Sequence, residues 1–457
     1  MTSVLLIYPY FKPRWDRSVF RFPPLGVAYI ASSLRKGGHE VHLLDCTFLS
    51  RKEALKRALD VQAPVVGVYS MATMVDDCLW FGRELRAASR LLIAGGPHPS
   101  WDPSPFMNVF DVVVRGEGEQ TVLELLQAFE HGGTFQSVPG IAYREDRSTR
   151  QVNLPEWSCT EARGTIQNLD AIPFPARDLL PNQDYIRHGR KKDGYSITTV
   201  LSTRGCPFRC EFCSNVVFGG SYRERSVENV IDEVEEALAF GYDRISFADD
   251  VFTLRKTRVL KICEEIRRRA LIFSWECLGR VDALDEETAR EMKRSGCRRI
   301  YFGIESGNAQ ILEQMNKKIT AEQARAAVMA AHRAGLEVGA FFILFYPGET
   351  NATVTETLRF AASLPVDYLG LSMPYPLPGT ALFERIKNRI TRDWKPGGRF
   401  LFSHELTYQS DFSEIKMQFG IFKGQMHLAL KRKTGSLSPI LLKIFDKTTD
   451  VIFDLLK

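Results

Sequence analysis

The sequence predicts an α/β protein built from two successive α/β segments and a helical end. Strand-like and helix-like stretches alternate over residues 1–150 and again over residues 195–380, a pattern typical of parallel sheets whose strands are connected by helices. A proline-rich stretch at 151–194 separates them, and the alternation fades over 381–457. We therefore expect a doubly wound sheet, a connector, a partial (β/α)6 barrel and a mostly helical C-terminal region.

The first segment should form the doubly wound sheet. Its apolar, strand-like runs cover residues 4–8, 41–44, 65–69, 91–94 and 112–114, and the helical patterns between them cover 25–36, 52–59, 76–89 and 121–130. Sheets of this kind bind ligands in the loops that follow the carboxyl ends of their strands. Several of these loops are rich in glycine and small polar residues, which makes them candidate ligand sites.

The barrel segment repeats the strand–helix unit. Its predicted strands cover residues 198–202, 244–248, 274–278, 299–304, 337–344 and 368–373. Barrel ligands also lie at strand carboxyl ends. Further helices are expected at 381–387, at 412–433 and from residue 438. The last helix has an apolar stripe beside lysines; it either docks on the barrel or, as a basic amphipathic helix, lies on a membrane surface.

Composition narrows the class of protein. The 457 residues are 44% hydrophobic and 25% charged, as in a soluble globular protein, and the net charge of +5 comes without a basic block that would suggest nucleic acid. Nine cysteines in a chain with no signal-peptide pattern indicate a reducing compartment. No apolar run reaches membrane-spanning length. We therefore expect a cytoplasmic protein that binds no nucleic acid.

Three cysteines form the most informative motif. Cys206, Cys210 and Cys213 have the spacing C-x3-C-x2-C within one short loop after the first barrel strand. Three thiolates can hold a [4Fe–4S] cluster and leave one iron open for a substrate. The alternative is a zinc loop or a set of unrelated thiols. A structural zinc site, however, needs a fourth Cys or His nearby, and none lies within about ten residues.

This motif, with Phe212 directly before the last cysteine, resembles the radical S-adenosylmethionine (radical SAM) superfamily. The resemblance implies that the open iron binds SAM and that an electron from the cluster releases a 5′-deoxyadenosyl radical. It also implies cosubstrate contacts at strand ends. Asp249 would contact the methionyl amine, Arg280 would clamp the SAM carboxylate, and Glu305 and Ser306 would reach the ribose or the carboxylate. Ser306 is also a good helix-capping residue, so a purely structural role stays open for it.

The first segment resembles the cobalamin-binding domains that are fused to radical SAM enzymes. The segments 23–26, 37–41, 95–99 and 115–121 occur in the order found in those domains. The resemblance implies a Rossmann-like fold that binds cobalamin, with Gly95, Gly96, Gly116 and Glu117 at the cofactor. A domain that has lost its cobalamin is the alternative.

The chain departs from one pattern of that family. The D-x-H-x-x-G signature, whose histidine replaces the lower ligand of cobalt, is absent. By the resemblance, the loop from Ser70 to Thr73 would approach the lower face of cobalamin without ligating, as a steric guard. His98 is either a loop histidine with local partners or a ligand at the edge of the cofactor.

Taken together, the two resemblances imply a cobalamin-dependent radical SAM methyltransferase. It would methylate an unactivated carbon through a 5′-deoxyadenosyl radical and methylcobalamin, with a small-molecule or lipid-like substrate, an external flavodoxin- or ferredoxin-type electron donor and, for a lipid-like substrate, peripheral membrane contact. One alternative keeps both cofactors but forms a ring or oxidises the substrate. Another, from a different class, is a non-catalytic cobalamin sensor or Fe–S electron carrier.

Overall fold

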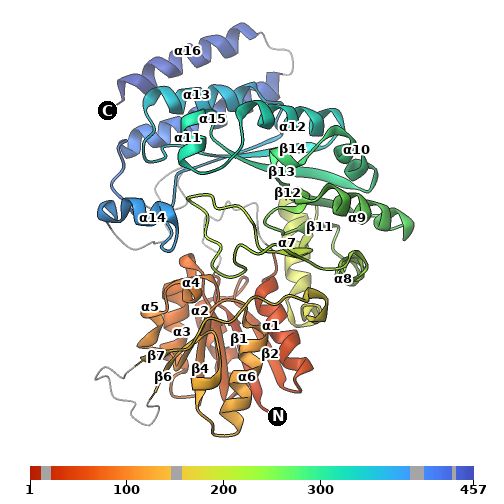
Figure 1. The fold of residues 1–457 in the computed structure, drawn as a ribbon, viewed down its shortest axis with the longest axis vertical. Coiled ribbons are helices and arrows are strands. Elements are labelled where there is room, and N and C mark those ends of the chain that lie inside the picture. The colour runs from red at the N-terminus through yellow and green to blue at the C-terminus, as the bar shows by residue number, and fades with distance from the viewer. Residues whose placement is uncertain (12–21, 146–156, 392–405, 435–438, 457) are drawn as a thin grey trace. The chain divides into compact units, whose positions relative to one another are not determined.

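The computed structural model describes residues 1–11, 22–145, 157–391, 406–434 and 439–456 (Figure 1). The chain forms two compact units. The first comprises Met1–Cys206 with Asn215–Ile245, and the second comprises Pro207–Ser214 with Ser246–Lys457. In this division the connector and the first barrel elements belong to the first unit, and the domain boundaries expected at 150, 194 and 380 stay predictions.

The first unit contains the expected doubly wound sheet. Its strand order is β2-β1-β3-β4-β5-β6-β7, and the strands from β2 to β5 run parallel. Two short antiparallel strands that the sequence pattern did not predict, β6 and β7, extend one edge. The strand bounds are β1 (Ser3–Tyr8), β2 (Glu40–Asp45), β3 (Val65–Tyr69), β4 (Leu91–Gly95), β5 (Val112–Val114), β6 (Ile141–Arg144) and β7 (Trp157–Cys159).

Helices cover both faces of this sheet, and each face has its own apolar core. Val4 and Leu6 of β1 point to the core formed with α1 (Leu25–Lys36) and α6 (Gly118–Glu130). Leu5 and Ile7 point to the core formed with α2 (Arg51–Val61) and α3 (Val75–Leu85). The strand is buried on both sides, which explains why its sequence is continuously apolar. The short helices α4 (Pro97–Trp101) and α5 (Ser104–Met107) follow β4.

The remainder of the first unit leads into the barrel. The connector contains a helix that the faded periodicity concealed, α7 (Asn182–Asp193), which ends at the left-handed residue Gly194. Next come β8 (Ile197–Val200), a two-stranded antiparallel ribbon of β9 (Thr203–Arg204) and β10 (Arg223–Glu224), and α8 (Val227–Ala239). The cluster motif lies between the two strands of this ribbon.

The partial barrel is confirmed as a six-stranded sheet with the order β15-β14-β13-β12-β11-β8. The strands from β12 to β15 are parallel. The bounds are β11 (Arg244–Phe247), β12 (Ser274–Gly279), β13 (Cys297–Glu305), β14 (Glu337–Ile343) and β15 (Tyr368–Ser372), with helices α9 (Lys256–Arg268), α10 (Glu286–Arg294), α11 (Ala309–Gln314), α12 (Ala321–Arg333) and α13 (Asn351–Ser363). Helix α12 begins with a capping box between Thr320 and Gln323.

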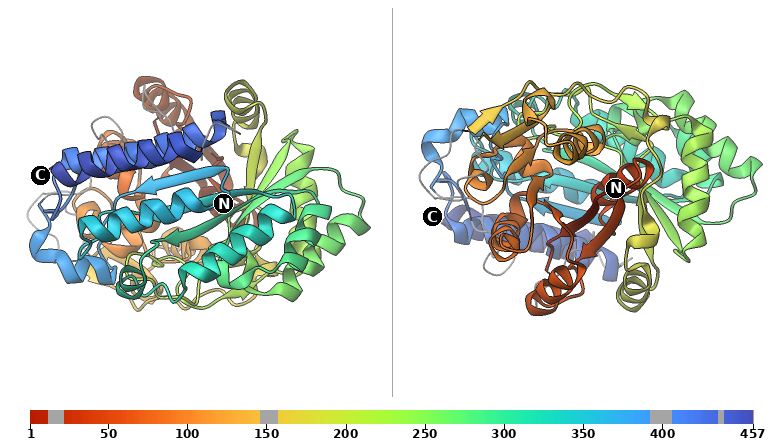
Figure 2. Two further views of the ribbon diagram at one scale, coloured as in Figure 1. Left: turned by 90° about the horizontal axis from the view of Figure 1, so that it is seen from above. Right: turned by 90° about the horizontal axis from the view of Figure 1, so that it is seen from below.

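The C-terminal region is mostly helical, as expected. It contains α14 (Ala381–Ile386), α15 (Glu414–Thr434) and α16 (Pro439–Leu455). In Figure 2 the helices α15 and α16, in blue, lie side by side, and both contact α13 of the barrel. Met417, Ile421 and Phe453 join a core with barrel residues, so both helices dock through apolar side chains. None of the described helices combines the length and hydropathy needed to cross a membrane.

Candidate functional site

The cluster loop starts from a tightly packed stem. Gly205, between β9 and Cys206, has a φ of 84°, and a side chain there would come within 2.2 Å of the backbone oxygen of Ser221. Only glycine therefore fits this position. The side chain of Asn215 donates a hydrogen bond to the carbonyl of Cys206 at 3.1 Å. Two further bonds, from the backbone NH of Cys213 to the carbonyl of Cys210 (3.1 Å) and from that of Glu211 to Met315 (2.9 Å), shape the rest of the loop.

The three motif thiols differ from most other cysteines of the chain in exposure. Cys206 and Cys210 are half-buried and Cys213 is exposed. Five others are buried, and burial raises the pKa of the Cys46, Cys78, Cys263 and Cys277 thiols, which keeps them protonated and unreactive. Within the described part of the chain, no three Cys, His, Asp or Glu side chains are gathered closely enough to hold a metal ion. The three-thiolate donor set of the loop fits a [4Fe–4S] cluster chemically.

Glu211, between the second and third cysteines, makes contacts that the sequence did not reveal. Tyr346, which follows β14, donates its hydroxyl proton to Glu211 Oε2 at 2.5 Å. Arg385 of α14 donates to both carboxylate oxygens, at 2.6 and 3.0 Å. Burial, together with Glu211, raises the pKa of Tyr346. Glu211 thus ties the middle of the cluster loop to a barrel loop and to the C-terminal region.

The predicted ligand Arg280 packs against Phe208 of the cluster loop and already has hydrogen-bond partners. Its guanidinium carbon is 3.5 Å from the centre of the Phe208 ring, and the side chain is 5% exposed. It forms a bidentate pair with Asp282 at 2.9 and 3.0 Å and donates to the carbonyl of Lys317 at 3.1 Å. A role for Arg280 as a carboxylate clamp stays a prediction, and such a clamp would have to share the guanidinium with Asp282.

Glu305 also has a partner that sequence reasoning missed. It ends β13 with a φ of 72°, next to an irregularity in the β13–β14 pairing. Its Oε1 accepts a hydrogen bond from the Lys317 ammonium at 2.9 Å, and both side chains are about nine-tenths buried. Burial alone would lower the pKa of Lys317, but Glu305 outweighs this effect and raises it, so Lys317 is a buried cation. Its ammonium is 5.8 Å from the ring centre of Phe212.

The remaining barrel positions are buried. Asp249 is fully buried after β11, and burial raises the pKa of its neighbour Asp250. The Ser306 hydroxyl lies 2.9 Å from that of Thr357 and accepts a hydrogen bond from the backbone NH of Asn308. Ser306 therefore supports the turn before α11, in line with the structural alternative, and its contact with SAM stays a prediction.

In the first unit, the predicted cofactor loops are joined to one another at the carboxyl edge of the sheet. The backbone NH of Ser70 donates to the carbonyl of Gly95 at 2.8 Å, and that of His98 donates to Ser70 at 3.2 Å. Gly96 has a φ of 115°, and a side chain there would come within 2.6 Å of Ser70 and 3.0 Å of the Tyr69 ring. Thr73 follows in a short 3-10 turn at Ala72–Met74.

His98 and Gly116 complete this edge. The His98 ring packs edge-on against Trp101 at 5.0 Å and Phe106 at 5.6 Å, as a loop histidine with local partners would. Gly116, with a φ of 77°, donates its backbone NH to Ser100 Oγ at 2.9 Å. The three loops that follow β3, β4 and β5 therefore share one edge, which is where a sheet of this type binds its ligand.

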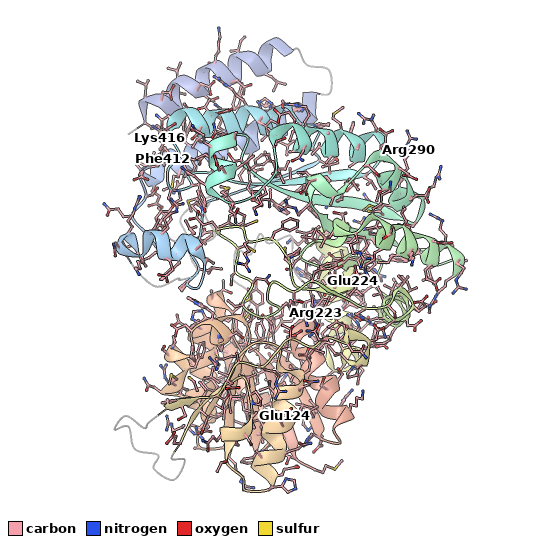
Figure 3. All side chains as sticks on the ribbon, viewed as in Figure 1. Glu124, Arg223, Glu224, Arg290, Phe412 and Lys416 are labelled. Atoms are coloured by element: carbon pink, nitrogen blue, oxygen red, sulfur yellow. The ribbon has the colours of Figure 1, made fainter. Side chains whose placement is uncertain are left out.

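Glu117 lies in a buried ion-pair network that the sequence did not reveal. Its carboxylate is 2% exposed and accepts hydrogen bonds from Arg204 (2.8 Å), from Arg223 (2.8 Å; labelled in Figure 3) and from the backbone NH of Ile166 (2.7 Å). Glu119 pairs with Arg204 at 2.6 Å. A contact between Glu117 and cobalamin stays a prediction, whereas its place in this buried ion-pair network is observed.

Comparison with known proteins identifies the two segments. Residues 200–361 match the family model of the Radical SAM superfamily, and residues 15–126 match that of the B12 binding domain. An uncharacterized methyltransferase of Pyrococcus horikoshii, PH0819, is 36% identical over 388 residues, which are 82% of this chain and 81% of that protein. An anaerobic magnesium-protoporphyrin IX monomethyl ester cyclase of Cereibacter sphaeroides is 26% identical over 407 residues, 85% of this chain and 64% of the cyclase.

Two solved structures have the same fold. The radical SAM methyltransferase TsrM from Kitasatospora setae, with cobalamin and a [4Fe–4S] cluster bound, superposes with a TM-score of 0.69 and 21% identity over 85% of this chain and 75% of TsrM. The cobalamin-dependent radical enzyme OxsB, with aqua-cobalamin and SAM bound, gives 0.75 and 19% over 99% of this chain and 72% of OxsB. The chain belongs to the radical SAM superfamily, among the members that carry a B12-binding domain.

Proposed function

We infer that this chain is a cobalamin-dependent radical SAM enzyme that methylates an unactivated carbon of a small-molecule substrate. One observation carries the inference. A loop with three thiols, which can hold a [4Fe–4S] cluster and leave one iron open, follows the first barrel strand. The N-terminal part of the same chain matches the B12 binding domain. The relatives named as methyltransferases support the outcome of the reaction. When bound, the cofactors supply reductive cleavage of SAM and delivery of a methyl group to carbon.

The residues of this chain have distinct tasks in the proposal. Cys206, Cys210 and Cys213 hold the cluster, and the strand-end residues Asp249 and Glu305 offer carboxylate oxygens to the methionyl amine or the ribose of SAM. The buried Lys317, paired with Glu305, supplies positive charge near the cluster loop. The joined loops at Ser70, Gly95, Gly96, His98 and Gly116 would surround the corrin ring.

Anaerobic reconstitution with iron, sulfide and hydroxocobalamin, followed by SAM and a strong reductant, tests the proposal. We expect bound corrinoid together with both 5′-deoxyadenosine and S-adenosylhomocysteine. Cys213→Ala should lose the cluster and all 5′-deoxyadenosine, whereas Cys159→Ala, which removes an exposed thiol outside the motif, should match the wild type. An intact cluster that yields neither product would contradict the proposal and favour a sensor or an electron carrier.

A cyclase is the second candidate, because a cyclase is among the relatives. With the true substrate present, formation of 5′-deoxyadenosine without S-adenosylhomocysteine, and without transfer of a labelled methyl group, would favour ring formation or oxidation.

The remaining parts of the proposal are a cytoplasmic location, a flavodoxin- or ferredoxin-type electron donor and, for a lipid-like substrate, membrane contact through α16. Fractionation, cross-linking to the donor and vesicle binding test these parts separately.

A further inference from the structure

The ribbon that carries the cluster loop places two positive charges directly opposite each other. Arg204 of β9 and Arg223 of β10 are paired residues in this antiparallel ribbon, and each is about 5% exposed. Like charges in this arrangement repel and destabilise a strand pair. Two buried guanidinium groups also cost several kcal/mol to desolvate unless carboxylates compensate them. The ribbon therefore needs negative charge from elsewhere in the first unit.

The B12-binding domain supplies that charge. Glu117 lies at the start of α6 and bridges both arginines, with its carboxylate 2.8 Å from each. Glu119, in the first turn of the same helix, accepts a hydrogen bond from the other terminal nitrogen of the Arg204 guanidinium at 2.6 Å. The network of Arg204, Arg223, Glu117 and Glu119 thus balances two positive charges with two negative charges.

Arg204 is also fixed from both sides by aromatic rings. Its guanidinium carbon lies 5.2 Å from the ring centre of Tyr29, on α1, and 5.1 Å from that of Phe218. Between Arg204 and the first cysteine there is a single residue, Gly205, which is packed against the backbone of Ser221. Because Gly205 is tightly packed and cannot shift, the position of the Arg204 backbone determines where the loop begins at Cys206.

We propose that this four-residue network is a positioning device through which the B12-binding domain fixes the stem of the cluster loop. Arg204, Glu117 and Glu119 are positioning residues in this sense, because they act through the backbone of Cys206. The proposal rests on the proposed function only in requiring that the loop binds a cluster. It assigns the two glutamates of the 115–119 loop to cluster assembly rather than to cobalamin.

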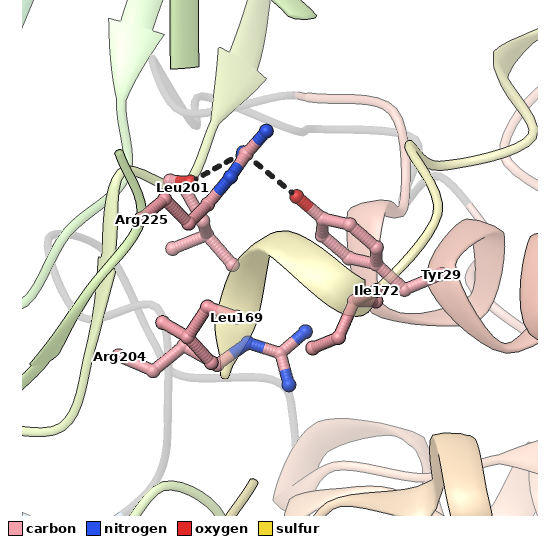
Figure 4. Close-up of a pocket in the computed structure, with 6 residues that line it drawn as sticks. All are labelled: Tyr29, Leu169, Ile172, Leu201, Arg204 and Arg225. Atoms are coloured by element: carbon pink, nitrogen blue, oxygen red, sulfur yellow. Dashed lines mark hydrogen bonds between the residues drawn. The ribbon is translucent and has the colours of Figure 1, made fainter. Parts of the chain in front are cut away.

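A second buried network in the same unit provides a matched control. Arg177 and Arg225 both pair with Glu233, which is fully buried. Tyr29 links the two networks, since its hydroxyl donates to Glu233 at 3.1 Å while its ring contacts Arg204. Figure 4 shows the small cavity between them, where Arg225 donates to the Tyr29 hydroxyl and to the carbonyl of Leu201. Both networks pair two buried arginines with carboxylates, but among the described contacts Glu233 bonds to none of the residues 203–206.

The experiment compares Glu119→Gln and Arg204→Met with Glu233→Gln in the full chain. Each protein is reconstituted with iron and sulfide, and the readouts are the EPR spectrum of the reduced cluster and the rate at which an iron chelator removes iron. We expect Glu119→Gln and Arg204→Met to release iron about tenfold faster, as expected for outer-sphere partners of metal ligands, and to alter the EPR line shape. Glu233→Gln should lower thermal stability and leave both readouts unchanged.

Two results would overturn the proposal. One is wild-type iron release and line shape in both Glu119→Gln and Arg204→Met. The other is an equal change in Glu233→Gln, since that would reflect general destabilisation. If Arg204→Met fails to fold, Glu119→Gln decides alone, because Gln keeps the size of the side chain. A wild-type protein that binds iron but transfers no methyl group would contradict the proposed function and leave this comparison intact.

Discussion

The cluster loop is anchored at two places by similar chemistry in different surroundings. At its stem, Arg204 is tied to Glu117 and Glu119 in a network whose side chains are at most 9% exposed. Between the second and third cysteines, Glu211 is tied to Tyr346 and to Arg385, which is 39% exposed. Buried charges are costly to leave unpaired, whereas exposed pairs contribute little. The stem should therefore tolerate substitution much less than the middle of the loop.

The largest expected effect is at the stem. Glu117→Gln removes the charge that bridges Arg204 and Arg223 and leaves Glu119, which pairs with Arg204, as the one carboxylate of the network. Breaking a buried ion pair from one side costs about 3–5 kcal/mol. We expect a loss of that size in the free energy of unfolding, measured by urea denaturation. A loss below about 1 kcal/mol would mean that water solvates the network, which would weaken the contrast between the two anchors.

At the other anchor, Glu211→Gln should cost less. It replaces charged hydrogen bonds to Arg385 and Tyr346 by neutral ones, which lowers stability by about 1–2 kcal/mol. The control is Glu384→Gln on α14, where an exposed carboxylate pairs with the exposed Lys387 and the expected change is below about 0.5 kcal/mol. Urea denaturation of both variants measures the difference. Equal effects would show that the contacts of Glu211 add no more stability than a surface pair.

The second anchor also carries a carboxyl group that should make stability depend on pH. Glu349 is 5% exposed, its Oε2 accepts a bond from the backbone NH of Tyr346, and its Oε1 has no hydrogen-bond partner among the described residues. Burial raises the pKa of Glu349 to about 8. Between its unfolded pKa, about 4.5, and pH 8, the folded state retains a proton that the unfolded state has released. Stability should therefore fall as pH rises through this window.

A single group of this kind contributes a slope of about 1.4 kcal/mol per pH unit. Glu349→Gln should remove that contribution, so the variant loses less stability than the wild type between pH 6 and pH 8. Urea denaturation at several pH values tests this. Parallel curves for the two proteins would contradict the raised pKa of Glu349. If the wild type gained stability relative to the variant over this range, the pKa would be lowered rather than raised.

The two anchors also show how far sequence reasoning reaches. The spacing of Cys206, Cys210 and Cys213 marks the loop because the chemistry requires three thiols close together in the chain. Strand periodicity marks the sheets because burial repeats locally. The anchors carry no such signal, since the partners of Glu117 lie 87 and 106 residues away and Arg385 lies 174 residues from Glu211.

Local sequence patterns do not reveal a partner that lies far away in the chain. A glutamate in a glycine-rich loop after a strand looks like a ligand contact, and for Glu117 that interpretation did not include the two arginines that occupy its carboxylate. Lys317 was missed because it follows a short helix and has no motif around it. The helix α7 was missed because its basic, polar sequence has little apolar periodicity.

The smallest expected effects come from the two tyrosine hydroxyls, and they compare the anchors most finely. Tyr29→Phe removes the bond to Glu233 but keeps the ring against Arg204, and Tyr346→Phe removes the bond to Glu211 but keeps the ring in its apolar cluster. Each should cost about 1–2 kcal/mol of unfolding free energy, since each deletes one hydrogen bond to a carboxylate.

The two variants should differ in the rate at which the chelator removes iron. Tyr346→Phe loosens the loop between Cys210 and Cys213 and should speed iron release, whereas Tyr29→Phe leaves the Arg204 contacts in place and should not. Faster release in Tyr29→Phe would mean that the stem depends on Glu233 as well, which would contradict the independence of the two buried networks.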